Sequence, residues 1–309
     1  METPNPRPIL VTGASSGIGR HLALALASQG HLVFATARKE RDLEILGQVE
    51  NILPVRLDVR DPAQVREAVD LVARNGQGLY GLVNNAGVGD LGPVSTWTDE
   101  DLRDIFEVNV FGPFRLTNAF LPMLVQSHGR IVLVGSQGGM ISMKYYGPYT
   151  MTKHALEAYS VTLADELGPY GVGVSIVQPG GVDTAIGENS FPGTLRHFQS
   201  AEPPFLEEAR AVLAGYDQPE EAHAADEPES ETNRKPSPPD IVSRAIFDAL
   251  FSEKPKLRYL VGTKWEGDRV IHALLEKLID ENDNPMHDYS LAELTWLLSQ
   301  KIQARKGTG

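Results

Sequence analysis

A tyrosine and a lysine four residues apart are well placed in this sequence to move a proton. The segment YYGPYTMTK, residues 145–153, contains three tyrosines, but only Tyr149 lies four residues before Lys153. That spacing puts both on one face of a helix, and the proline at 148 suits a first helical turn. A neighbouring ammonium lowers the pKa of a phenol, which then becomes a usable general acid or base. Taken alone, the segment also fits an ordinary Tyr–Lys pair on a helix surface.

A second candidate site is the glycine-rich segment TGASSGIG, residues 12–19. Gly13, Gly17 and Gly19 follow an apolar run and precede a segment of helical periodicity. Glycines between a strand and a helix allow a tight turn and a close backbone approach, and the helix N-terminus attracts a diphosphate. The segment therefore predicts a dinucleotide site, the alternative being a purely structural turn.

The elements that would hold these residues alternate between strand and helix. Most of the strand-like runs are continuously apolar, as expected for strands covered on both faces. The strand-like runs are 8–12, 32–37, 52–57, 79–84, 130–135, 172–178 and 257–261. Helical periodicity marks 17–29, 62–75, 99–125, 149–168, 239–252, 265–280 and an amphipathic stretch at 289–302. The alternation predicts an α/β fold with a parallel sheet and helices on both faces.

Composition limits the classes of partner. The net charge of −13 argues against nucleic acid or an anionic membrane as the main partner, because both need a basic surface. The chain has no cysteine and its eight histidines are scattered, so we expect neither disulfides nor a metal site. The N-terminus is too polar for a signal peptide, and no apolar run approaches the roughly 20 residues of a membrane span. These features predict a cytoplasmic protein.

Six motifs spread along the chain make the sequence similar to the short-chain dehydrogenase/reductase family. The family's TGxxxGxG and YxxxK patterns are both present, together with NNAG at 84–87, VNVFGPF around Asn109, VGSQGG around Ser136 and QPGGVDT at 178–184. The resemblance covers residues 7–190 strongly and 239–280 by the order of elements only. It implies one Rossmann-type domain over 1–309, with a doubly wound parallel sheet of about seven strands.

The resemblance also implies catalytic roles. Tyr149 would be the general acid or base, and Lys153 would lower its pKa and bind the nicotinamide ribose. Ser136 would donate to the substrate oxygen. Asn109 would anchor a proton-relay water; Pro113, four residues on, leaves its carbonyl without the usual helical donor. Alternatively, Asn109 marks only a kink in a helix, and Ser136 is only a structural serine at the end of a strand.

The same resemblance implies a set of cofactor contacts along the chain. They are Gly13, Ser15, Ser16, Gly17, Ile18, Gly19, Arg38, Asp58, Val59, Asn84, Asn85, Ala86, Gly87, Tyr149, Lys153, Pro179, Gly180, Val182 and Thr184. NADP(H) is favoured over NAD(H), because Arg38 follows the second strand where NAD-binding members carry an acid. An arginine can bind a 2′-phosphate that an acid would repel.

Five further aromatic residues lie in segments that the resemblance places near the substrate. Tyr145 and Tyr146, with Met140, Ile141 and Met143, either line an apolar pocket or pack in the core. The resemblance places a substrate loop at 190–240, with Phe191, Phe198 and Phe205 as a hydrophobic cover. Within it, the acidic and proline-rich stretch 218–240 is expected to be a disordered surface loop. Residues 282–309 are expected to form a C-terminal helical extension that packs on the domain or binds a partner.

The predicted function is an NADP(H)-dependent oxidoreductase that interconverts a carbonyl and a secondary alcohol. Its partner would be a small-molecule carbonyl or alcohol, apolar if the aromatics line its pocket, and the resemblance implies a homo-oligomer. The alternatives are a non-catalytic NADP-binding sensor or scaffold, and an epimerase or dehydratase built on the same fold.

Overall fold

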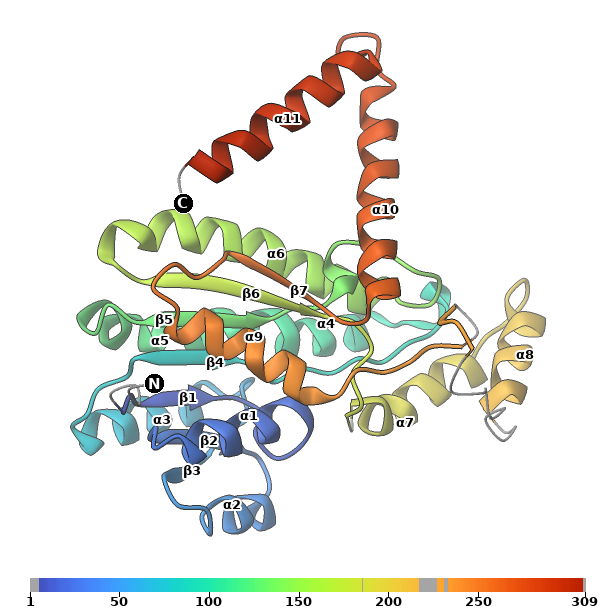
Figure 1. Cartoon of the computed structure of the whole chain (residues 1–309). Coiled ribbons are helices and arrows are strands. Elements are labelled where there is room, and N and C mark those ends of the chain that lie inside the picture. The colour runs from blue at the N-terminus through green and yellow to red at the C-terminus, as the bar shows by residue number, and fades with distance from the viewer. Residues whose placement is uncertain (1–5, 185, 217–226, 231–232, 308–309) are drawn as a thin grey trace. The chain divides into compact units, whose positions relative to one another are not determined.

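A seven-stranded parallel sheet organises the chain in the computed structural model (Figure 1), which describes residues 6–184, 186–216, 227–230 and 233–307. The strand order is β3-β2-β1-β4-β5-β6-β7. The strands are β1 (Ile9–Val11), β2 (Val33–Ala37), β3 (Ile52–Arg56), β4 (Gly81–Asn84), β5 (Arg130–Val134), β6 (Gly173–Pro179) and β7 (Arg258–Val261). Every predicted run is a strand, and the prediction of a Rossmann-like doubly wound sheet is confirmed.

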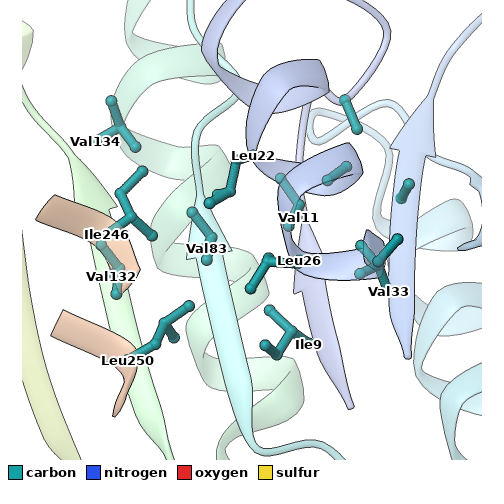
Figure 2. Packing of buried hydrophobic residues seen from close by; sticks show 14 of the residues in the cluster. Ile9, Val11, Leu22, Leu26, Val33, Val83, Val132, Val134, Ile246 and Leu250 are labelled. Carbon is teal, nitrogen blue, oxygen red and sulfur yellow. The ribbon is translucent and has the colours of Figure 1, made fainter. Parts of the chain in front are cut away.

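Helices cover both faces of the sheet because successive residues of each strand point to opposite sides. One face packs against α1 (Gly17–Ser28), α2 (Glu40–Leu46) and α9 (Pro239–Phe251). The other face packs against α3 (Pro62–Asn75), α5 (Gly112–Gln126) and α6 (Gly147–Leu167). In β1, for example, Ile9 and Val11 enter the first layer and Leu10 the second. Figure 2 shows the first layer, where Leu22 and Leu26 of α1 lie near Ile9, Val11 and Val83.

The long helix predicted over 99–125 is interrupted at the expected place. It consists of α4 (Asp99–Phe106), a π-helical segment over Glu107–Phe111, and α5. Pro113 lies in the first turn of α5, where its missing N–H removes the donor that Asn109 would need for a regular helical bond. The interruption therefore has a local cause in the sequence.

The described part of the segment predicted as a substrate loop, residues 190–240, is largely helical. It contains α7 (Ile186–Gln199) and α8 (Leu206–Tyr216), which share a small apolar cluster centred on Phe198, Ala201 and Ala209. The disordered loop expected over 218–240 falls partly outside the described residues, at 217–226 and 231–232. For residues 233–238 the expectation is wrong, because Ser237 is buried and pairs through its backbone with Gly181 and Asp183.

The chain divides into two compact units, residues 1–267 and 268–309. The second unit contains most of α10 (Lys264–Asn282) and all of α11 (Leu291–Gly307). Across the described ranges, no helix is both long and apolar enough to cross a membrane.

Candidate active site

The predicted site residues gather around a cavity at the carboxyl ends of β1, β4, β5 and β6. The sheet order reverses between β1 and β4, and such switch points are where doubly wound sheets bind ligands. The cavity has a volume of about 490 Å³. Of the predicted residues, it is lined by Gly13, Ser15, Ser16, Gly17, Ile18, Arg38, Asp58, Val59, Asn85, Ala86, Gly87, Ser136, Tyr149, Lys153, Pro179, Gly180, Val182 and Thr184.

The glycine turn forms a cradle that suits a diphosphate. Gly13 and Gly17 have φ angles of 65° and 53°, which residues other than glycine rarely adopt. A Cβ on Gly13 would lie 3.0 Å from the Cα of Ala86, so a side chain there would force the two turns slightly apart. The N-cap of α1, Ser16, makes no side-chain capping bond, and the first turn of α1 contains no acid. The positive end of α1 is therefore left to an anionic ligand.

Hydrogen bonds join the glycine turn to the NNAG turn across the sheet. The Oγ1 of Thr12 accepts from the backbone N–H groups of Asn85 and Ala86, both at 2.9 Å. The Nδ2 of Asn85 donates to the carbonyl of Thr12 at 2.8 Å. These bonds fix the two walls of the cavity relative to each other.

Three polar groups meet at the inner end of the cavity. Tyr149 lies in the first turn of α6, and the Ser136 hydroxyl hydrogen bonds its phenol. The Nζ of Lys153 donates to the carbonyl of Val134 at 3.0 Å and lies 5.6 Å from the centroid of the Tyr149 ring. Tyr149 and Lys153 therefore share a helix face, as their spacing predicts.

Burial shifts the pKa of both groups. Burial lowers the pKa of Lys153 to about 8. Burial also raises the pKa of Tyr149, and it outweighs the hydrogen bond from Ser136, which acts in the opposite direction. The expectation that the pKa of Tyr149 is lowered is therefore wrong for the protein groups by themselves. The physical reason is that removal from water disfavours the phenolate, and Lys153 directs its ammonium at a carbonyl.

Asn109 is buried behind the cavity wall and does not line the cavity. Its Oδ1 accepts from the backbone N–H of Val88, and its Nδ2 donates to the carbonyl of Val88, both at 2.9 Å. The Nδ2 also donates to the Oγ1 of Thr152 at 3.1 Å. The side chain thus joins the π-helical segment to α6 and to Val88, which does line the cavity.

Gly19 and Asn84 are the other predicted residues that do not line the cavity. A Cβ on Gly19 would lie 2.4 Å from the carbonyl oxygen of Gly13, so this glycine allows α1 to start close to the turn. Asn84 is buried, and its Nδ2 donates to the Oγ1 of Thr117 at 3.4 Å. The structure gives Asn84 a packing position in place of the predicted direct cofactor contact.

The opposite end of the cavity carries charged side chains. Arg38 is exposed and lines the cavity beside Lys39 and Asp42. The Arg60 guanidinium hydrogen bonds the carboxylate of Asp58 and thereby lowers its pKa.

Some residues of the cavity wall were not predicted from the sequence. They are Thr36, Ala37, Lys39, Asp42, Leu57, Val88, Val108, Val134, Gly135, Ile186, Asn189 and Ser190. Ile186, Asn189 and Ser190 belong to α7, a helix that the sequence patterns do not predict and that overlaps the start of the substrate loop expected over 190–240. The Oγ of Ser190 accepts from the backbone N–H of Gly89 at 3.0 Å, which holds α7 against the loop after β4.

The two further tyrosines do not line the cavity. The Tyr145 ring packs edge-on against Phe198 at 5.1 Å between centroids, in the cluster under α7 and α8. Tyr146 packs edge-on against Tyr149 at 6.5 Å. Phe198 is buried, whereas Phe191 and Phe205 are exposed. Core packing is therefore the arrangement found for Tyr145.

Among the residues that the structure describes, no group of histidine, aspartate and glutamate side chains is placed to hold a metal ion.

Comparison with known proteins gives consistent matches. The family model described as short chain dehydrogenase matches residues 7–194. The Escherichia coli (strain K12) protein named "Uncharacterized oxidoreductase YbbO" is 35% identical over 260 residues, covering 82% of this chain and 85% of that protein. A short-chain dehydrogenase structure from Streptomyces avermitilis has a TM-score of 0.71 at 31% identity, covering 90% of this chain and 95% of that one. The structure of an actinorhodin polyketide ketoreductase with NADPH has a TM-score of 0.67 at 26% identity, covering 82% and 95%.

Proposed function

The chain belongs to the short-chain dehydrogenase family of oxidoreductases, and on that premise we propose that it interconverts a carbonyl and a secondary alcohol with NADP(H). The observation that carries the proposal is the meeting of Ser136, Tyr149 and Lys153 at one end of a cavity whose other end carries Arg38. The experiment that tests it is turnover of NADPH on a panel of ketones and aldehydes. Absence of net NADPH oxidation on every member would contradict it.

In this proposal each side chain has a separate task. The nicotinamide, when bound, would exchange a hydride with the substrate carbon. The Ser136 hydroxyl donates a hydrogen bond to the substrate oxygen, where negative charge develops during reduction. The Tyr149 phenol delivers the proton to that oxygen, or removes it in the reverse direction. The Lys153 ammonium places a positive charge beside the phenol. It donates one hydrogen bond to the carbonyl of Val134 and has further N–H groups that can donate to the cofactor.

The shape of the glycine turn supports the proposal that a dinucleotide occupies the cavity from this turn to the end that carries Tyr149. Backbone N–H groups at the start of α1 would bind the diphosphate, and Asp58 with Val59 would contact the adenine. Asn85 and Ala86 would flank the adenosine ribose, and Pro179 to Thr184 the nicotinamide. The similar actinorhodin ketoreductase binds NADPH, which is consistent with this assignment.

Arg38 is the group that would select NADP(H). Its side chain is exposed at the cavity wall, after β2, and Thr36 and Ala37 leave that strand end without an acid. The first acid after it, Glu40, forms an ion pair with Arg56 and does not line the cavity. Asp42, in the first turn of α2, does line the cavity. The positive charges of Arg38 and Lys39 must therefore outweigh the repulsion between this carboxylate and a 2′-phosphate.

We expect kcat/KM to favour NADPH over NADH by at least about tenfold, and Arg38→Ala to remove most of that preference, since a charge-assisted hydrogen bond contributes about 1.5–3 kcal/mol. NADH kinetics should change little. Both cofactors are measured on one substrate for wild type and variant. Arg41→Ala is the matched control, because it removes one positive charge from the same segment outside the cavity wall. A wild-type preference for NADH would disprove the assignment.

A further inference from the structure

A buried carboxylate lies directly behind the cavity wall. Glu266 is 1% exposed and sits in the first turn of α10, within the unit formed by residues 1–267. Its Oε2 accepts from the backbone N–H of Thr263 at 3.2 Å, and the Oγ1 of Thr263 accepts from the backbone N–H of Glu266 at 3.2 Å. This reciprocal pair of hydrogen bonds is a capping box, so the contact made by one carboxylate oxygen follows from the start of the helix itself.

The other oxygen reaches a distant part of the chain. The Oε1 of Glu266 accepts from the backbone N–H of Gly181 at 2.6 Å. Arg234 lies 3.6 Å from the same oxygen. Gly181 stands between Gly180 and Val182, both of which line the cavity. A capping box does not require this contact, so the second oxygen has a separate role, which is to bind the backbone of the cavity wall.

Glycines make room for the carboxylate. A Cβ on Gly180 would lie 2.1 Å from the Oε2 of Glu266, and one on Gly262 would lie 2.5 Å from the same atom. A Cβ on Gly181 would lie 3.2 Å from Oε1. Any side chain at the first two positions would therefore displace the carboxylate from its position against the wall.

The Gly181 peptide is also held from its other side. The backbone N–H of Ser237 donates to the carbonyl of Gly181 at 2.8 Å, and the N–H of Asp183 donates to the carbonyl of Ser237 at 2.9 Å. Gly180 donates to the carbonyl of Val261 at 2.8 Å. Within this set, Glu266 supplies the charged partner, and a charged acceptor makes the stronger bond.

We propose that Glu266 is a positioning residue that fixes the Gly180–Gly181 backbone for cofactor binding. The inference rests on the proposed function, because it assigns that segment to the cofactor. Loss of the carboxylate should weaken cofactor binding more than it slows the chemical step, since Glu266 touches none of the groups assigned to proton transfer.

The test uses the full chain and NADPH as the probe. We expect Glu266→Gln to raise the Kd for NADPH by about tenfold, with kcat at saturating NADPH within about twofold of wild type. Thr263→Ala is the matched control: it damages the same capping box, should lower Tm, and should leave Kd unchanged. An unchanged Kd in Glu266→Gln, or an equal rise in Thr263→Ala, would overturn the proposal.

A second variant and a second readout keep the result decisive. If Glu266→Gln does not fold, Gly181→Ala is used, whose methyl group presses on Oε1; an unchanged Kd there also overturns the proposal. Amide hydrogen exchange over residues 179–184 should become faster in Glu266→Gln and not in Thr263→Ala. If wild type binds neither NADPH nor NADH, the proposed function fails, while hydrogen exchange still decides whether Glu266 holds the segment.

Discussion

Replacing Tyr149 with phenylalanine is expected to lower kcat by about 10²–10⁴-fold, the usual contribution of a positioned general acid or base. Phenylalanine keeps the ring that packs against Tyr146 and removes the hydroxyl group that carries the transferable proton. The Kd for NADPH should stay within about threefold of wild type, because the substitution removes at most one neutral hydrogen bond to the cofactor. Single-turnover kinetics with saturating NADPH and a direct binding titration measure the two quantities separately.

The other two tyrosines provide the controls. Tyr145→Phe and Tyr146→Phe should both retain readily measurable turnover, because neither side chain lines the cavity. Phenylalanine at position 145 keeps the ring that packs against Phe198, so we expect the stability of that variant to change little as well. Equal inactivation in either control would show that the wrong tyrosine has been assigned, and near-normal activity in Tyr149→Phe would show that the proton takes another route.

Replacing Lys153 with methionine is expected to abolish most turnover without destabilising the protein at neutral pH. Burial lowers the pKa of Lys153 to about 8 from 10.5 in its unperturbed form. By the relation between pKa shift and free energy, the charged form costs about 3 kcal/mol of stability at pH 7. Methionine removes that cost, which offsets the lost hydrogen bond to the carbonyl of Val134. We therefore expect a Tm at pH 7 no lower than that of wild type, with kcat reduced by about 10²-fold or more.

The pH dependence gives this prediction a second measurement. Below pH 8 both the folded and the unfolded chain keep the Lys153 proton, and the folded state bears the full burial cost. Between pH 8 and 10.5 only the unfolded state keeps it, so this group makes the free energy of unfolding rise with pH. Denaturant titrations between pH 8 and 10.5 should show this rise in the free energy of unfolding for wild type. The contribution from Lys153 should be absent in Lys153→Met. A variant whose Tm falls sharply at pH 7 would assign Lys153 a structural role.

Most of the fold followed from local patterns. The seven runs form strands because their lengths suit strands better than helices, and because a mostly apolar run suits a sheet covered on both faces. Pro113 predicted the interruption near Asn109 by removing a backbone donor, and the structure has a π-helical segment there. The helices α7 and α8 were missed because both have short apolar faces, and because α7 contains Pro192, which is unfavourable inside a helix. The apolar cluster that the two helices share also includes Tyr145, which is remote from them in sequence.

The sequence by itself determined the spacing of Tyr149 and Lys153 on one helix face, the conformational freedom of Gly13 and Gly17, and the absence of an acid between β2 and Glu40. Each depends on residues a few positions apart, within reach of helix geometry and backbone sterics. Only the tertiary structure decided the raised pKa of Tyr149, the buried positions of Asn84 and Asn109, and the contact of Glu266 with Gly181. These depend on desolvation and on pairs up to 85 positions apart, which chain folding brings together and which no local pattern specifies.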